Sequence, residues 1–281
     1  MVCVKNDPRT NKGLTREQLY VACSRATSLE GLYIDGTFEP PRAPQPNDPV
    51  SLEMERLRQE PFTFDQLFLQ DYSPNHTTLF YMNIQYFKKH EQDIKHDQCA
   101  MSADFLCFVE PHVLDGDEID ITGYRLLKRT NSTSRQSSDG ALVYAKNEIV
   151  DVNPYYNILR DDKGHCLYVY WTYHTNQYIM TYRNPTCKME TFKKLLDEAL
   201  DDLRGDVLLF GDINVDLSRD KAMLNYMTKY NIESKLDINV SSTISGTHID
   251  CLFSNITNIE AKFYNTYYSH HNAISAVIQQ D

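Results

Sequence analysis

The 281-residue sequence contains no apolar run that approaches the roughly 18 residues of a membrane-spanning helix. Its first residues also lack the apolar segment of a secretory signal peptide. Both absences argue against membrane insertion and against secretion. We therefore expect an intracellular protein without a membrane partner.

The sequence also lacks the cysteine spacing of a zinc site or of a disulfide framework. Its seven cysteines are odd in number, and no two of them form a Cys-x-x-Cys pair. Several lie inside apolar runs, where free cysteine behaves as a small core residue. We expect reduced thiols in an intracellular compartment. The set comprises Cys3, Cys23, Cys99, Cys107, Cys166, Cys187 and Cys251.

An excess of positive charge is absent as well. The formal net charge is -11 at pH 7, so the chain as a whole is not a nonspecific binder of polyanions. Any contact with nucleic acid must come from a local basic patch. The length is sufficient for one core of ordinary size and an appendage.

The most informative feature that is present is a strand-like run with polar residues at its end. Residues 207–210 are apolar, and Gly211, Asp212, Ile213 and Asn214 follow them. Residues i and i+2 of an extended chain point to the same side, so Asp212 and Asn214 would face a common pocket. A simple turn after a strand is the alternative, because these polar residues are common in turns.

Other apolar runs also have polar residues at their ends. Asn83 ends one such run and Glu110 ends the next. Asp250 begins a third run, and the paired imidazoles His270 and His271 precede the last one. The chain thus places Asn, Glu, Asp, Asn, Asp and His, in that order, at strand ends.

This ordered set resembles the endonuclease/exonuclease/phosphatase family, which includes deoxyribonuclease I, exonuclease III, abasic-site endonucleases and the endonucleases of non-LTR retrotransposons. The resemblance covers residues 76–281, and segment 211–214 and the terminal Ser-x-His are its most specific parts. It implies an α/β fold, a four-layer sandwich of two packed mixed β-sheets flanked by helices. It also implies a metal-dependent hydrolase of phosphate esters.

The resemblance assigns the metal to the carboxylate of Glu110, with Asn83 beside it. Hard oxygen ligands suit Mg²⁺, and Mn²⁺ is expected to substitute. A solvated strand end is the alternative for Glu110. The family usually has an aspartate where this chain has His270. Because imidazole is softer and uncharged, we expect weaker Mg²⁺ binding and attenuated activity.

The resemblance also implies catalytic roles. Asp212 would position the attacking water, and Asn214 would hydrogen-bond a nonbridging phosphate oxygen. His271 would stabilise the charge of the transition state or transfer a proton, with Asp250 fixing its tautomer and orientation. An exposed residue near the chain end is the alternative for His271.

A tyrosine completes the implied site. Segment 179–185 matches a Tyr-Arg-x-Pro strand end of the family, where the tyrosine hydroxyl contacts the scissile phosphate. Tyr182 is the matching residue. Tyr173 is the alternative, because the chain has 19 tyrosines and most of them are expected in the core or at interfaces.

A basic cluster lies between residues 124 and 146. Arg125, Lys128, Arg129 and Arg135 occur there with one intervening acid, Asp139. The cluster could follow the phosphates of DNA, which is the partner that we expect. A solvated polar loop is the alternative.

Residues 1–36 resemble a different family. On pattern alone, residues 14–23 form a small amphipathic helix. Segment 20–25 resembles the last motif of superfamily 1B DNA helicases of the RecD and Helitron type, in which Arg25 would match an arginine finger. The chain lacks a Gly-x-x-x-x-Gly-Lys-Ser/Thr phosphate cradle, so this finger is orphaned and we expect no ATP binding by this chain alone. We interpret residues 1–36 as a helicase fragment from a truncated gene or a decayed mobile element.

The remaining pattern predicts a linker and one larger domain. Five prolines within residues 40–49 predict a linker over residues 37–75. Helices are expected at 84–97 and 188–203, and a hairpin at 172–177. Strands are expected at 78–84, 104–109, 141–145, 166–173, 177–183, 206–211, 249–254, 260–266 and 273–278.

Three functions compete. We expect a DNA endonuclease of a helicase-fused mobile element, with a nuclear location, because only this function explains the helicase resemblance. A phosphatase of lipid or inositol phosphates would leave plasmid DNA intact. An inactive binding module of the same fold would dock on nucleic acid or protein without hydrolysis.

Overall fold

The structure is a computed structural model that describes residues 2–5, 32–35, 51, 52, 55, 75–134, 137–201, 203 and 205–280. Two compact units divide the chain, Met1–Phe64 and Asp65–Asp281. In the first unit, β1 (Val2–Lys5) pairs in parallel with β2 (Leu32–Asp35). The helicase-like segment with Arg25, and Arg135 of the basic cluster, lie outside the described residues.

The second unit contains two six-stranded mixed sheets. The strand order is β11-β12-β10-β9-β8-β7 in the first sheet and β13-β14-β3-β4-β6-β5 in the second. The first sheet comprises β7 (Tyr155–Arg160), β8 (His165–Tyr173), β9 (Asn176–Arg183), β10 (Asp206–Asp212), β11 (Glu233–Ser234) and β12 (Asp250–Ser254). The second comprises β3 (His76–Asn83), β4 (Phe105–Val109), β5 (Tyr124–Thr130), β6 (Ala141–Lys146), β13 (Ile259–Tyr264) and β14 (Ala273–Gln279).

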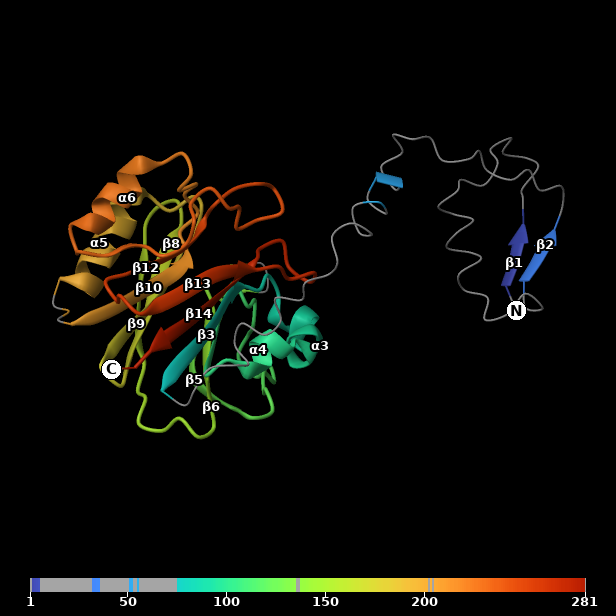
Figure 1. Ribbon diagram of the computed structural model, residues 1–281, viewed down its shortest axis with the longest axis horizontal. Coiled ribbons are helices and arrows are strands. Elements are labelled where there is room, and N and C mark those ends of the chain that lie inside the picture. Colours follow the sequence, from blue (N-terminus) through green and yellow to red (C-terminus); the bar gives the residue numbers. More distant parts are fainter. Residues whose placement is uncertain are drawn as a thin grey trace. The chain divides into compact units, whose positions relative to one another are not determined.

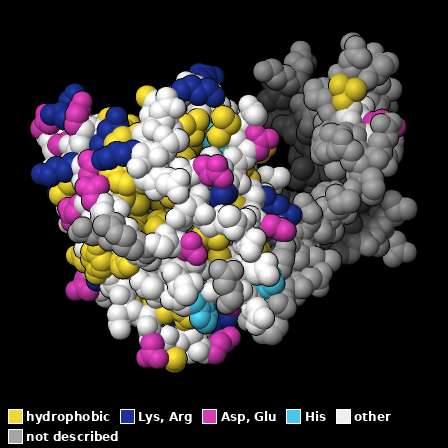
Figure 2. Space-filling view, turned by 60° about the vertical axis from the view of Figure 1, so that its left-hand side comes forward, with side chains coloured by type: hydrophobic (Ala, Val, Ile, Leu, Met, Phe, Trp, Pro, Cys, Tyr) yellow, Lys and Arg dark blue, Asp and Glu magenta, His cyan; other side chains and the backbone are white. Residues whose placement is uncertain are grey.

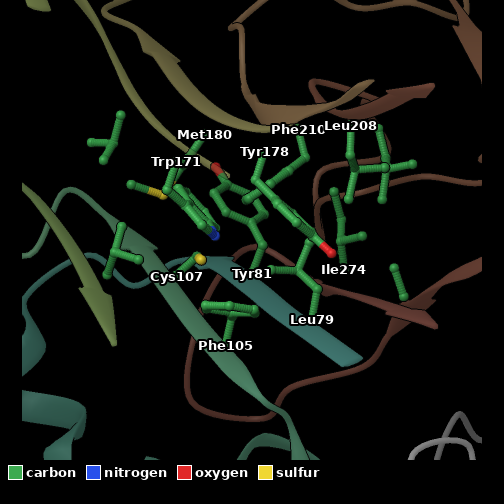
Figure 3. Packing of buried hydrophobic residues seen from close by; sticks show 14 of the residues in the cluster. Leu79, Tyr81, Phe105, Cys107, Trp171, Tyr178, Met180, Leu208, Phe210 and Ile274 are labelled. Atoms are coloured by element: carbon green, nitrogen blue, oxygen red, sulfur yellow. The ribbon is translucent and has the colours of Figure 1, made fainter. Parts of the chain in front are cut away.

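The sheets pack face to face because their strands are apolar on both sides. Along β3, Leu79 and Tyr81 belong to the cluster between the sheets, whereas Phe80 belongs to the cluster on the outer face. Figure 3 shows the inner cluster, where Tyr81 packs near Phe210 with ring centroids 5.6 Å apart. Alternate side chains of one strand thus enter two different cores.

Helices cover the outer faces of both sheets (Figure 1). The apolar sides of α5 (Met189–Leu200) and α6 (Lys221–Thr228) pack on the first sheet. The second sheet is covered by α3 (Phe87–His96) and α4 (Gln98–Ser102). The predicted four-layer sandwich is confirmed. None of the helices in these described segments has the length and apolar content that crossing a membrane requires.

The first predicted helix begins three residues later than expected. Gln85 and Tyr86 have positive φ angles of 41° and 82°, which a helix excludes. The backbone N–H of Tyr86 donates to the carbonyl of Glu110 at 3.1 Å instead. The end of β3 is therefore tied to the end of β4, and this connection shapes one wall of the site described below.

The nine predicted strands correspond to observed strands, but β5, β7 and the short β11 were not predicted. β5 and β7 are edge strands, each with one paired neighbour. Edge strands carry charged and polar residues, so they lack the apolar runs on which the prediction relied. The polar loop that was the alternative for the basic cluster is wrong for residues 124–130, which form β5.

Candidate active site

The carboxyl ends of several strands meet between the two sheets. In the first sheet, Tyr182, Asp212 and Asp250 are register neighbours on β9, β10 and β12. Asn83 ends β3 of the second sheet, and its Nδ2 donates to Asp212 Oδ2 at 2.9 Å. This hydrogen bond joins the two sheets at Asp212, the first polar residue after the apolar run at 207–210.

Gly211 allows β9 and β10 to pair closely beside Asp212. Its φ is 153°, and a Cβ atom at this position would lie 1.8 Å from the carbonyl oxygen of Thr181. Any larger side chain would push the strands apart. The glycine of the Gly-Asp-x-Asn segment is therefore a packing requirement of the strand end.

Asn214 reaches the site through a turn and not through strand alternation. β10 ends at Asp212, and Asn214 has a φ of 50°. Its backbone N–H donates to Asp212 Oδ1 at 2.9 Å, and its Nδ2 donates to the carbonyl of Arg183 at 2.8 Å. The prediction that the two residues share one side of an extended strand is wrong. A strand and a turn, which the sequence analysis gave as alternatives, both occur: Asp212 ends the strand, and Asn214 lies in the turn that follows it.

Arg183 is a positioning residue that the sequence did not single out. Its buried guanidinium donates to the carbonyls of Ile213 and Asn214, both at 3.3 Å, and to that of Cys187. It therefore holds the turn after Asp212. Its place next to Tyr182 in the Tyr-Arg-x-Pro segment is the signal that could have identified it.

Asp250 and His271 form a buried pair. His271 Nδ1 and Asp250 Oδ2 are 2.8 Å apart, and the side chains are 7% and 0% exposed. The alternative that His271 is an exposed residue near the chain end is therefore wrong. Ser269 supports the pair, because its hydroxyl donates to the carbonyl of Asn83 at 2.9 Å and accepts the N–H of His271 at 3.2 Å.

Burial and neighbouring charges shift the pKa values of His271 and Asp212. Burial would lower the pKa of His271, but the adjacent charge of Asp250 and their hydrogen bond raise it to about 9. The contact with Asp250 therefore favours the protonated form of His271. Burial, followed by the charge of Asp250, raises the pKa of the Asp212 carboxyl.

Glu110 directly follows β4 and has a left-handed conformation, with a φ of 51°. The hydroxyl of Tyr182 donates to Glu110 Oε1 at 2.7 Å. Burial would raise the pKa of Glu110, but hydrogen bonds from His112, Tyr182 and Asn83 lower it overall. The structure thus supports an anionic Glu110 and favours Tyr182 over Tyr173, which pairs with Asn176 at the opposite end of β9.

His112 is a second residue that the sequence did not single out. Its Nε2 lies 3.9 Å from Glu110 Oε2, and its ring stacks on the exposed ring of Tyr86 with centroids 4.1 Å apart. A lone histidine three residues after the end of β4 gives no periodic signal. The left-handed backbone conformations of Glu110 and His112 bring its ring to the carboxylate.

The donor set fits a divalent cation. Ligand atoms of Asp212, Asp250 and His271 all lie within 4.8 Å of one another, and Glu110 lies near them, because Asn83, which donates to Asp212, also hydrogen-bonds Glu110. Asp250 Oδ1 is buried and has no hydrogen-bond partner among the described residues. Buried acidic oxygen atoms gathered at one place, one of them without a hydrogen-bond partner, are donors that a divalent cation would satisfy. His270 is exposed and is not part of this cluster.

The basic cluster is divided along β5. Arg125, near the start of the strand, donates to the carbonyl of Ile149 at 2.9 Å. Lys128 and Arg129 lie at the other end, near the strand end that precedes Glu110, because Thr130 pairs with Ala141 and Ala141 with Val109. On the face that Figure 2 shows, Lys and Arg side chains lie among Asp and Glu side chains.

The structure has solved neighbours of low sequence identity. One is the endonuclease domain of TRAS1, a telomere-specific non-LTR retrotransposon, with a TM-score of 0.56 and 14% identity over 73% of this chain and 100% of that chain. The chain has the endonuclease/exonuclease/phosphatase fold. An endonuclease/exonuclease/phosphatase from Bacteroides vulgatus is similar as well, with a TM-score of 0.54 and 11% identity over 73% of this chain and 99% of its own.

An AP endonuclease from Archaeoglobus fulgidus is a third neighbour of this fold. Its TM-score is 0.54, with 13% identity over 72% of this chain and 99% of its own. No protein-family model and no curated protein matches the sequence. At these identities the similarity establishes the endonuclease/exonuclease/phosphatase fold, and the function must be argued from the site itself.

Proposed function

We propose that this protein is a metal-dependent phosphodiesterase, and specifically a DNA endonuclease. The observation that supports this function most directly is the buried centre of Asp212, Asp250 and His271, tied to Asn83 across the two sheets. Hydrolysis of a phosphodiester requires a positioned water, a proton acceptor and positive charge at the phosphate. The centre supplies a candidate for each requirement.

Glu110 would hold the divalent cation, with Asn83 beside it. Mg²⁺ suits these oxygen donors, and Mn²⁺ is expected to substitute. A bound cation would neutralise charge that develops on the phosphate. The hydrogen bonds that lower the pKa of Glu110 keep it in the anionic form that such a ligand needs.

Asp212 would position the attacking water and accept its proton. Both carboxylate oxygens are fixed, one by Asn83 and one by the backbone N–H of Asn214. Its raised pKa brings the carboxyl closer to working pH, which improves a general base. The Asn214 side chain would bind a nonbridging oxygen of the phosphate.

His271 would stabilise the negative charge of the transition state as an imidazolium. The contact of Nδ1 with Asp250 leaves the Nε2 edge for the substrate and fixes the orientation of the ring. The hydroxyl of Tyr182, next to Glu110, would contact the scissile phosphate. These roles follow the resemblance stated above, and the distances are compatible with them.

DNA is the substrate that we propose. Because the chain is acidic overall, contact with DNA requires a local basic patch near the site. Lys128 and Arg129 lie there. The resemblance of residues 1–36 to a helicase motif favours a mobile element and a nuclear location. The orphaned Arg25 would give this chain no ATPase activity.

A nicking assay tests the proposal. Supercoiled plasmid DNA and an inositol phosphate are incubated in parallel with the full chain and with Mg²⁺ or Mn²⁺. We expect relaxation of the plasmid in both metals and slower reaction in Mg²⁺. Release of phosphate from the inositol phosphate with intact plasmid would favour a phosphatase, and no reaction with either would favour a binding module.

A further inference from the structure

A cavity of about 340 Å³ opens between the edge strands β5 and β7, outside the catalytic centre. Each sheet contributes one edge, so the cavity lies where the sandwich is not closed by a further strand. Its lining includes Arg129, Asn131, Asp139, Tyr156, Ile158 and Arg160.

The cavity is positively charged within an acidic chain. Arg129 and Arg160 line it, and Lys128 Nζ lies 4.4 Å from the ring centroid of Tyr156. Arg129 donates to the neutral carbonyls of Leu114 and Asp117, so these contacts do not cancel its charge. Three cations therefore gather at one place in a chain whose formal net charge is -11.

The only acid in the lining is directed inward. Asp139 is paired with Arg160 at 2.6 Å, and its side chain is 1% exposed whereas that of Arg160 is 50% exposed. The other oxygen of Asp139 accepts hydrogen bonds from Thr133 and Ser137. Asp139 thus fixes Arg160 in place, and the outer side of the guanidinium faces solvent.

The cavity is close to Tyr182 of the candidate active site. Arg160 pairs with His165 on β8, and the His165 ring lies 5.7 Å from the ring of Tyr182. β7 and β9 are separated by one strand, which corresponds to about 10 Å. One strand of nucleic acid carries a phosphate every 3.4 Å or so along its axis, and a distance of about 10 Å therefore spans a few nucleotides.

We propose that this cavity is a second phosphate subsite, in which Arg129 and Arg160 bind a backbone phosphate and Tyr156 stacks on an adjacent base of a single DNA strand. The subsite rests on the proposed function, because the same strand would continue to the centre at Asp212. The exposed ring of Tyr156 and the cations beside it combine the two contacts by which proteins bind single strands, stacking and charge.

Binding of a fluorescent single-stranded oligodeoxynucleotide to the full chain, followed by anisotropy without divalent cation, tests the subsite. Tyr156→Ala should weaken binding about tenfold, because one stacked base is lost. Tyr156→Phe keeps the ring and should bind as the wild type does. Arg129→Gln should also reduce the slope of log K against log salt by about 0.7, the value for one phosphate contact of a single strand.

Three controls separate the subsite from general effects. Arg129→Lys keeps the charge and should keep the salt slope. Lys194→Gln removes an exposed cation of α5, on the outer side of the first sheet, and should leave binding unchanged. Thermal unfolding of each variant shows whether the edge strands remain folded.

The two proposals can fail separately. A wild-type chain that does not bind the oligonucleotide, or a Tyr156→Ala variant that binds it as tightly as the wild type, overturns the subsite. If the oligonucleotide binds through Tyr156 but plasmid DNA is never cut, the proposed hydrolysis is wrong and the subsite stands. If plasmid DNA is cut but the variants bind normally, only the subsite is wrong.

Discussion

Asp212 is held by polar contacts from both sheets although it is buried. Asn83 and the backbone of Asn214 each donate to one of its oxygens. A buried carboxylate next to Asp250 is unfavourable for folding unless a cation or a proton compensates it. The arrangement therefore opposes stability unless it is compensated, and the proposed function gives it a chemical reason.

The sequence predicted the acidic and imidazole residues of this centre because they end apolar runs. It did not predict Arg183 and His112, since both act through contacts that have no sequence period. Arg183 binds backbone carbonyls of a turn about 30 residues away in sequence, and His112 depends on the left-handed conformations of Glu110 and His112 after β4. Such contacts exist only in the folded chain.

His270 is the position where the chain departs from the family pattern, and its side chain is exposed. His270→Asp would add a hard anionic oxygen beside His271. We expect plasmid nicking in Mg²⁺ to increase relative to nicking in Mn²⁺, with an unchanged melting temperature. If the ratio of nicking in Mg²⁺ to nicking in Mn²⁺ is the same for the wild type and His270→Asp, position 270 does not act on the metal.

Asp139 links stability to pH. Burial opposes its ionisation, but hydrogen bonds from Ser137, Arg160 and Thr133 lower the pKa of Asp139 to about 2, below the unfolded value of about 3.9. The stabilisation is present above the unfolded pKa and is lost as pH falls through about 2. Asp139→Asn should therefore lower the free energy of unfolding by roughly 1–2 kcal/mol at pH 7 and by less at acidic pH. Urea titrations of the wild type and the variant at pH 7 and at acidic pH measure this difference in the free energy of unfolding. An equal loss of stability at the two pH values would contradict the linkage.

At the scale of elements, burial decided what the sequence could predict. Strands such as β4, with every residue buried, were found because both faces are apolar. β5 and β7 expose charged side chains and pair on one side only, so their register depends on β6 and β8. The hairpin at 172–177 was predicted correctly, as β8 and β9 pair directly across it.

The parallel pairing of β9 with β10 depends on Gly211. Gly211→Ala would place a methyl group against the carbonyl of Thr181, which neither strand can avoid without moving. We expect a loss of more than about 2 kcal/mol in the free energy of unfolding, together with loss of activity. Gly123→Ala is the matched control, because Gly123 also has a positive φ but open space around it. It should lose only about 1 kcal/mol. Equal losses would show that close pairing is not the cause.

At the scale of the whole molecule, the chain comprises two compact units that meet in sequence after Phe64. This boundary falls within the linker predicted over residues 37–75, which predicts that the residues before the linker fold independently of the domain after it. We therefore expect deletion of residues 1–60 to leave the melting temperature and the nicking rate nearly unchanged. A fall of more than about 5 °C would show that the first unit stabilises the second.

The central claim is that Asp212 directs hydrolysis of DNA from the end of β10, and one comparison tests it most directly. Nicking of supercoiled plasmid by the wild type and by Asp212→Ala is measured in Mg²⁺ and in Mn²⁺, with circular dichroism of both proteins as the control for folding. We expect nicking by the wild type and a loss of at least about a hundredfold in the variant, with its fold intact. An inert wild type, or a variant that nicks at nearly the wild-type rate, would contradict it.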